Sequence, residues 1–224
     1  NASKIEEISS KIDMVFCAVD MDKKAIKKLE EDYAKKGIAV ISNNSANRKV
    51  ADVPMVIPEI NPEHIKVIDA QRVRLGTSTG FIAVKPNCSI QSYVPPLEPL
   101  KELGIEKVLA CTYQAISGGS KTFETWPEMV DNVIPYIGGE EEKSEQEPLK
   151  VFGHIEGNKI IHASEPLISS QCIRVPVSDG HLATVFVSFE NKPTKETILK
   201  RWKEYRGKPQ ILNLPNAPKQ FLTY

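Results

Sequence analysis

The chain has 224 residues, which is enough for one large domain or two small ones. Hydrophobic residues make up 41% and charged residues 26%, an ordinary composition for a protein that buries a sizeable core. Lys plus Arg and Asp plus Glu both number 29, so the formal net charge is zero and no global attraction to nucleic acid is expected. No apolar run approaches the ~20 residues that cross a bilayer, so no membrane segment is predicted.

The four cysteines lie far apart in the sequence and form no CxxC pair. This spacing argues against a zinc site and against a dense disulfide framework. We therefore expect reduced thiols, a cytoplasmic location and no bound metal. A reduced thiol is also available as a nucleophile.

The N-terminal part alternates strand-like and helix-like segments. Residues 12–19 form a short apolar run with β-branched side chains, which predicts a strand buried on both faces. Residues 22–36 carry apolar side chains at helical spacing and stop at Gly37, so they predict a helix. This succession of strand, helix and strand predicts a parallel sheet. Further strands are predicted at 38–42, 53–57 and 81–84.

The pattern changes after Asn87, where a domain boundary is predicted. Asn87 or Ser89 can cap a helix predicted from about 91 to 103, which ends at Gly104. The longer strands beyond it indicate a mostly antiparallel or mixed sheet of an α+β domain. These strands are predicted at 107–115, 150–152, 159–163, 171–177 and 181–189, and a last helix is predicted at 194–205.

Cys88 is the first candidate for chemistry. It follows a buried strand and precedes a helix, so its sulfur is expected at a helix N-terminus. There the macrodipole and unpaired N–H groups stabilise a thiolate and can hold an oxyanion. The alternative is a small buried apolar residue, which is the commoner fate of a cysteine without a disulfide.

His181 and Arg174 are the second and third candidates. His181 follows a Ser-Asp-Gly turn and begins a strand, and histidine is the usual proton-exchange partner of a thiolate near neutral pH. A turn histidine alone is more often structural, so the interpretation depends on its pairing with Cys88. Arg174 lies seven residues earlier and can bind a carboxylate or phosphate in the same pocket, or form a salt bridge at a strand end.

Two further stretches are weaker signals. Glu140 and Lys143 lie one helical turn apart after a Gly-Gly pair, which also fits a solvated acidic helix start. Ser117 and Gly118 belong to a loop of small residues that lets a ligand approach the backbone closely.

Six stretches resemble, in the family's own order, the aspartate-semialdehyde dehydrogenases, particularly the archaeal and fungal branch. They span nearly the whole chain, which makes the resemblance specific. The stretches are 42–48 (SNNSANR), 56–61 (VIPEIN), 86–89 (PNCS), 113–118 (YQAISG), 138–143 (GGEEEK) and 174–181 (RVPVSDGH).

The resemblance implies a fold of class α/β plus α+β. Residues 1–86 would be the remaining part of a Rossmann-like, NADP-binding domain. Residues 87–224 would be a catalytic and dimerisation domain like that of glyceraldehyde-3-phosphate dehydrogenase. A homodimer or homotetramer is implied, with small molecules as the other partners. The implied setting is biosynthesis of lysine, methionine and threonine, including the diaminopimelate pathway.

The resemblance also implies a reaction. Cys88 would attack L-aspartyl 4-phosphate and expel phosphate, and hydride from NADPH would reduce the thioester to aspartate semialdehyde. A thioester keeps its carbonyl electrophilic enough for this step. The resemblance implies that His181 is the acid/base and that Gln114 orients the acyl group. Arg174 would bind the substrate carboxylate, and Glu140 would bind its amino group. Arg48, Asn87 and Lys143 would bind the phosphate, and Ser117 and Gly118 would bind the cofactor.

The chain departs from the family at both ends. Family members open with a strand and a Gly-rich turn that cradles the dinucleotide phosphates, and they continue past the equivalent of Tyr224. We therefore expect a fragment that binds NADPH poorly.

Three alternatives stay open. A malonyl-CoA or N-acetylglutamyl-phosphate reductase has a similar architecture. A non-catalytic fragment would only dimerise. A cysteine hydrolase would use Cys88 and His181 but leave Arg174 and Gln114 unexplained.

Overall fold

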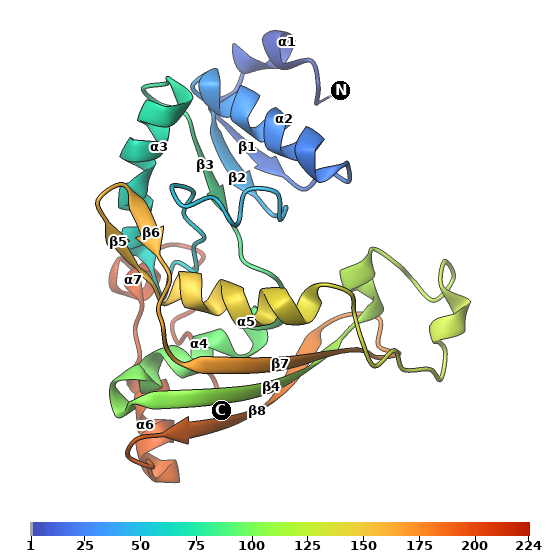
Figure 1. Ribbon diagram of the computed structural model, residues 1–224, viewed down its shortest axis with the longest axis vertical. Helices are drawn as coiled ribbons and strands as arrows, with labels where there is room; N and C mark the ends of the chain where they lie inside the picture. Colours follow the sequence, from blue (N-terminus) through green and yellow to red (C-terminus); the bar gives the residue numbers. More distant parts are fainter. Residues whose placement is uncertain (1) are drawn as a thin grey trace. The chain divides into compact units, whose positions relative to one another are not determined.

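A computed structural model describes residues 2–224, which form two compact units (Figure 1). The first unit comprises the chain up to Pro86 together with Lys150–His162, and the second comprises Asn87–Leu149 together with Ala163–Tyr224. The predicted second domain covered all of 87–224, whereas compactness groups Lys150–His162 with the first unit. The buried Lys150 explains the difference, because its Nζ donates to the carbonyls of Arg48 and Val50 at 2.7 Å each.

A three-stranded parallel sheet forms the centre of the first unit. Its elements are α1 (Ile5–Ser9), β1 (Met14–Cys17), α2 (Lys23–Lys35), β2 (Ala39–Ser42), η1 (Pro62–Val67), α3 (Ile68–Leu75), β3 (Phe81–Val84), β5 (His154–Glu156) and β6 (Lys159–Ile161). The strand order is β1–β2–β3, and α2 is the crossover from β1 to β2. Asp22 caps α2 by accepting the Lys24 N–H at 2.9 Å. The predicted parallel sheet is confirmed.

One strand prediction and one burial prediction in this unit were wrong. Residues 53–57 form only an isolated bridge between Met55 and Val84, because the Asn61 side chain takes the Ile57 N–H and the Met55 carbonyl instead. β1 is not buried on both faces. It is an edge strand of the described sheet, and Phe16 on its outer face is 77% exposed.

At Ile82 the outer edge of β3 is paired with a side chain. Gln71 of α3 is fully buried, and its Oε1 accepts the Ile82 N–H at 2.6 Å. Its Nε2 donates to the carbonyls of Ile82 and Asp52, each at 2.9 Å. One amide group therefore satisfies three buried backbone groups.

Replacing Gln71 with Leu keeps the side-chain volume but leaves those three groups without partners. We expect a loss of about 2–4 kcal/mol in the free energy of unfolding, measured by urea denaturation. Val73→Ala on the same helix, where Val73 is 83% exposed, should stay within about 0.5 kcal/mol of the unmodified protein. A Gln71→Leu protein as stable as this control would contradict the prediction.

A three-stranded mixed sheet forms the second unit. Its elements are η2 (Ser89–Ser92), α4 (Val94–Leu97), η3 (Glu98–Leu103), β4 (Ile105–Gln114), η4 (Ile116–Gly119), η5 (Pro127–Met129), α5 (Glu140–Val151, which ends in the first unit), β7 (Leu167–Arg174), β8 (His181–Phe189), α6 (Lys195–Glu204) and α7 (Lys208–Ile211). β4 lies in the middle, parallel to β7 and antiparallel to β8. The predicted mixed sheet is confirmed.

Two segments of the second half differ from the prediction. Residues 150–152 are not a strand, because the helix that starts at Glu140 continues to Val151. The single helix predicted from 91 to 103 is instead η2, α4 and η3 in succession. Pro95, Pro96 and Pro99 explain this break, since each lacks the N–H that a continuous α-helix needs.

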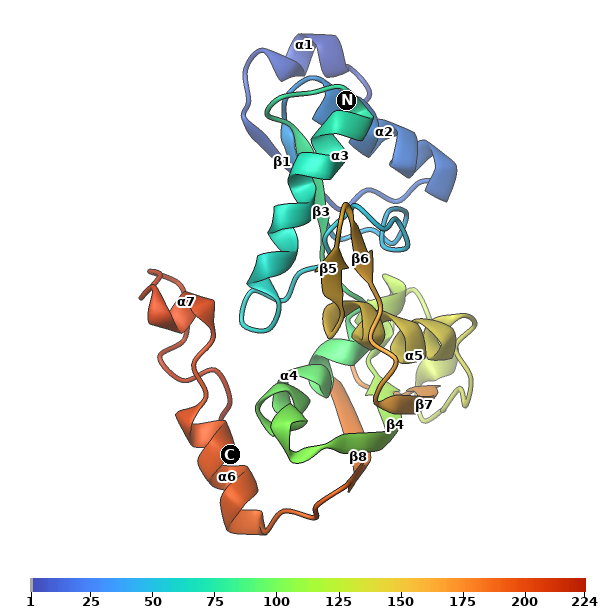
Figure 2. The same cartoon turned by 60° about the vertical axis from the view of Figure 1, so that its left-hand side comes forward.

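The two faces of the mixed sheet differ in environment. α4 and α5 lie on one side of it (Figures 1 and 2), and Val108 and Cys172 are fully buried there. The other face presents Leu109, Leu182 and Phe186, which are 56%, 64% and 75% exposed.

The outer edge of β7 is closed by side chains of α5 and by a loop. Glu145 accepts the Ser170 N–H at 3.0 Å, and Glu141 accepts the Cys172 N–H at 3.3 Å. The Arg174 N–H donates to the Ile134 carbonyl at 2.8 Å. The outward N–H groups at alternate residues of β7 are therefore occupied, which blocks pairing with another strand.

Candidate active site

Strand register places three of the predicted site residues in one row across the end of the mixed sheet. Gln114, the last residue of β4, pairs with Arg174 of β7 on one side and with His181 of β8 on the other. Adjacent strands bring such directly opposed residues within ~5 Å of one another. Residues that lie 60 and 67 positions apart from Gln114 in the sequence thus share one edge.

Cys88 contacts this row through His181. Its Sγ lies 3.2 Å from His181 Nε2, and the Cys88 side chain is exposed. The Ala115 N–H donates to His181 Nδ1 at 3.1 Å. The neutral imidazole therefore carries its proton on Nε2, which faces the sulfur. The structure brings together the two side chains that the sequence analysis paired, and their catalytic roles stay a prediction.

The contact with Cys88 shifts the titration of His181. The hydrogen bond to Cys88 raises the pKa of His181 above its ordinary value, helped by the charge of Cys88 and by the Gly180 backbone, while burial and Arg174 oppose the rise. Because the pKa of His181 is raised in the folded state, protonated His181 stabilises the fold fully at pH values below the ordinary histidine pKa. This contribution to folding stability is lost as the pH rises through the raised pKa.

Removing the sulfur should reverse the direction of this shift. In Cys88→Ala, burial and Arg174 remain as the main influences, so we expect the pKa of His181 to fall below the ordinary histidine value. An NMR titration of the His181 ring proton measures it, with Cys111→Ala as the control that leaves the pKa raised. An unchanged His181 pKa in Cys88→Ala would show that the thiol does not interact with the ring in solution.

Glu140 is the centre of a polar cluster that includes Asn87, the residue before Cys88. Its Oε1 accepts from Lys143 Nζ at 2.6 Å, and its Oε2 accepts from Asn87 Nδ2 at 2.9 Å. Burial opposes its ionisation, but hydrogen bonds and charge from Lys143, Asn87 and Gln114 outweigh it and lower the pKa of Glu140. The carboxylate is thus ionised at neutral pH, and its stabilising contribution is lost as the pH falls through the lowered pKa.

Arg174 places a buried positive charge in the row. The residue is 6% exposed, and its guanidinium donates to the Ala115 carbonyl at 2.6 Å. Burial lowers the pKa of Arg174, opposed by Glu140 and Cys88, yet a guanidinium stays protonated in proteins. Gln114, 1% exposed, donates to Thr112 Oγ1 at 3.2 Å.

Ser117 and Gly118 form an exposed loop next to Arg174 and His181. A Cβ atom at position 118 would lie 2.9 Å from Arg174 Nη1 and 3.2 Å from His181 Nε2. Glycine therefore lets the backbone come this close to both side chains, whereas a larger residue would require Arg174 to shift. This thin loop fits the close approach of a flat ligand, as the sequence analysis expected of a cofactor-binding segment.

Arg48 belongs to the first unit, apart from the other predicted site residues. It is 7% exposed and its Nη2 donates to the Asn43 carbonyl at 2.9 Å. Its role in binding phosphate stays a prediction.

Three residues around the site were not found from the sequence. Ser144 and Glu147 of α5 and Tyr93 of the segment after Cys88 are all buried and hydrogen-bonded to this region. The sequence signal that could have found the two α5 residues is their spacing, because residues 140, 144 and 147 lie on one face of a helix.

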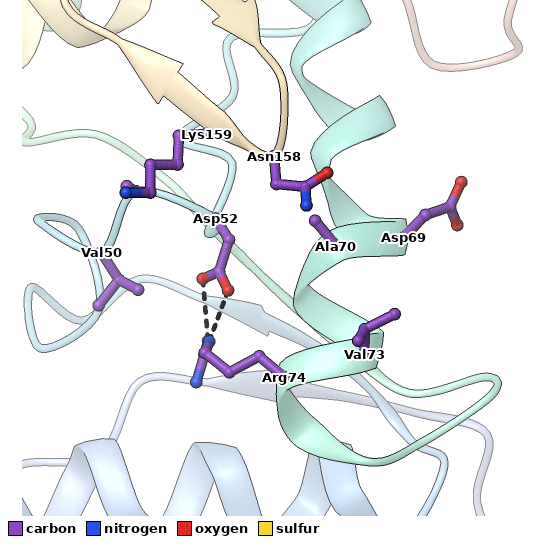
Figure 3. A pocket seen from close by; sticks show the side chains of 9 residues that line it. Val50, Asp52, Asp69, Ala70, Val73, Arg74, Asn158 and Lys159 are labelled. Atoms are coloured by element: carbon purple, nitrogen blue, oxygen red, sulfur yellow. Dashed lines mark hydrogen bonds and ion pairs between the residues drawn. The ribbon is translucent and has the colours of Figure 1, made fainter.

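A cavity of about 630 Å³ in the first unit contains none of the predicted site residues. Figure 3 shows Asp52 facing Arg74 in it, with Arg74 Nη2 2.9 Å from the Asp52 carboxylate. Arg74 also pairs with Glu31, so the main charges of this cavity are mutually compensated. We assign it no chemistry.

Among residues 2–224, no group of three or more His, Cys, Asp or Glu side chains is arranged to hold a metal ion. No disulfide joins the four cysteines, all of which lie in that range. In the same part of the chain no helix is both long and apolar enough to cross a membrane.

Two family models match the chain. Residues 97–223 match "Semialdehyde dehydrogenase, dimerisation domain", and residues 1–68 match "Semialdehyde dehydrogenase, NAD binding domain". The chain therefore belongs to the semialdehyde dehydrogenase family.

The relatives within this family carry a more particular name. The aspartate-semialdehyde dehydrogenase of Archaeoglobus fulgidus is 40% identical over 94% of this chain, and that of Candida albicans is 38% identical over 93%. A crystal structure of the Candida albicans enzyme with NADP matches 94% of this chain with a TM-score of 0.81 and 34% identity. The chain spans 59% to 61% of the length of these relatives.

Proposed function

We propose that the protein reduces L-aspartyl 4-phosphate to aspartate semialdehyde with NADPH, through a thioester on Cys88, in cytoplasmic amino-acid biosynthesis. The observation that carries the proposal is the contact of Cys88 Sγ with His181 Nε2 at 3.2 Å, at the end of a row that includes Gln114 and Arg174. The related enzymes named above support the choice of substrate.

The covalent step starts from the Cys88 thiolate, after the thiol proton has left to solvent from this exposed side chain. The Cys88 thiolate attacks the acyl carbon, a C–S bond forms, and the C–O bond to phosphate breaks with its electron pair leaving on phosphate. The Nε2–H of His181 stabilises the thiolate before the attack. It is then placed to donate to the carbonyl oxygen next to the sulfur when negative charge develops there.

The charges of these side chains support a proposal for substrate recognition. Arg174 is a buried cation suited to the substrate α-carboxylate, and the ionised Glu140 is suited to its ammonium group. Lys143 and Asn87, both hydrogen-bonded to Glu140, are suited to the phosphate. This ionic complementarity favours a small zwitterionic acyl phosphate over an uncharged acyl group.

Ser117 and Gly118 are the residues of this chain proposed to hold the nicotinamide end of NADP. The exposed, thin loop beside His181 is the observation that fits it. When bound, NADPH supplies the hydride that the reduction of a thioester to an aldehyde requires.

The acylation step is testable without cofactor. We expect exposure to L-aspartyl 4-phosphate, generated in situ, to add one aspartyl group to the unmodified protein, seen by intact-mass spectrometry. The adduct should be released by hydroxylamine and be absent in Cys88→Ala. Cys111→Ala, which alters a strand cysteine of the same unit, should acylate normally. An adduct that survives in Cys88→Ala would contradict the assignment of the nucleophile, and its absence from the folded unmodified protein would contradict the reaction.

We also propose that two copies pair through the open face of the mixed sheet. The segment that matches the dimerisation-domain model contains this face, and Leu109, Leu182 and Phe186 are exposed on it. The edge of β7 is closed by Glu141 and Glu145, so the face rather than the edge is available. An exposed apolar patch of this kind is typical of an association surface.

A charge in this face should separate the copies. We expect Phe186→Asp to shift the molar mass from dimer to monomer in size-exclusion chromatography with light scattering, because burying an unpaired carboxylate in an apolar interface is costly. Phe16→Asp, at an equally exposed phenylalanine of the first unit, is the control that leaves the dimer intact. A dimer that persists in Phe186→Asp would refute this choice of surface.

A further inference from the structure

The turn that carries Cys88 is held by one face of helix α5. Glu140, Ser144 and Glu147 are spaced so that they lie on the same side of the helix. Glu140 binds the Asn87 side chain, and Ser144 Oγ lies 2.7 Å from Ser89 Oγ. Both residues that flank Cys88 are therefore attached to α5.

Glu147 holds the backbone immediately before Cys88. It is 8% exposed, and its Oε2 accepts the Asn87 N–H at 2.5 Å. The Asn87 Oδ1 in turn accepts the Ser89 N–H at 2.8 Å, which folds the chain tightly around Cys88. A carboxylate is a stronger acceptor than a neutral carbonyl, so this contact resists displacement of the turn.

A proline provides the second attachment. Pro148 lies inside α5 and has no N–H to donate to the carbonyl of Ser144, four residues earlier. The hydroxyl of the fully buried Tyr93 donates to that carbonyl instead. Burial raises the pKa of Tyr93, which keeps its hydroxyl protonated as a donor. The Ser144 carbonyl, which lacks a helical donor, thus holds the segment that follows Cys88 through its hydrogen bond with Tyr93.

We propose that Glu147, together with the Ser144 carbonyl that Pro148 leaves available to Tyr93, positions Cys88 against His181. This inference rests on the proposed function, in which Cys88 is the nucleophile. Glu147 accepts the Asn87 N–H and Tyr93 donates to the Ser144 carbonyl, so both are positioning residues. Their effect is exerted through the backbone of the turn, where a shift of ~1 Å is enough to change a reaction rate about a hundredfold.

The reactivity of Cys88 toward iodoacetamide measures its position without substrate or cofactor. Peptide mapping assigns the modified cysteine, and the rate is followed as a function of pH in the whole protein. In Glu147→Ala we expect the rate near neutral pH to fall about tenfold and the pH profile to move toward that of an ordinary thiol. Glu147→Gln keeps an acceptor in the same place and should restore the rate to within about threefold.

Glu145→Ala is the matched control, because Glu145 also lies on α5 and accepts a backbone N–H, but that of Ser170 in β7. It should leave the alkylation profile of Cys88 unchanged. Equal slowing in Glu145→Ala and Glu147→Ala would show a general loosening of α5 and would overturn the inference. So would an unchanged profile in Glu147→Ala.

Tyr93→Phe tests the second anchor with a milder change and remains informative if Glu147→Ala does not fold. We expect slower alkylation in Tyr93→Phe, and a smaller effect of the same substitution in a Pro148→Ala background. There the Ser144 carbonyl regains a helical donor, so it no longer depends on the tyrosine. Equal effects of Tyr93→Phe in both backgrounds would overturn the part assigned to Pro148.

His181→Ala distinguishes the failure of this inference from the failure of the proposed function. If Cys88 of the unmodified protein reacts no faster near neutral pH than in His181→Ala, the pair is not activated and the proposed function falls, together with the positioning role. If the pair is activated but the Glu147 and Tyr93 variants behave like the unmodified protein, only the positioning role falls.

Discussion

The register of β4 between its two neighbours is the constraint on which the candidate site depends. Gln114 lies opposite Arg174 in a parallel pairing and opposite His181 in an antiparallel one. Because side chains alternate between faces, a slip of one residue in either pairing would send one of them to the opposite face of the sheet. The chemistry of the row is therefore set by backbone hydrogen bonds that extend over the whole length of the strands, rather than by any local motif.

The charges of the site are arranged so that each is compensated before a substrate arrives. Glu140 is ionised by Lys143 and Asn87, and the buried guanidinium of Arg174 donates to a backbone carbonyl. An isolated charge at such depth is costly, whereas a paired and hydrogen-bonded one is tolerated. A charged ligand would replace these internal partners with its own groups, so no charge of the site would be left unpaired on binding.

Sequence reasoning succeeded where a local pattern determines the structure. The strand from His181 to Phe189 alternates cleanly, and the helix after Asp22 has a clear cap, so both were predicted within a residue. It failed where a distant partner decides the outcome. Residues 150–152 are apolar enough for a strand, but they complete a helix that begins ten residues earlier. The pairing of Cys88 with His181 followed from their chemistry, whereas the function of Glu147 depends on a contact across 60 positions.

The closure of the β7 edge has a consequence for how this strand can diverge. The hydrogen bonds from Glu141, Glu145 and Ile134 that close this edge engage only main-chain groups of β7. They therefore do not depend on which side chains β7 carries. Substitutions at β7 residues other than the buried Cys172 and Arg174 therefore leave the edge closed, whereas loss of Glu141 or Glu145 would open it. The protection of this strand edge depends on the sequence of α5 and not on that of β7.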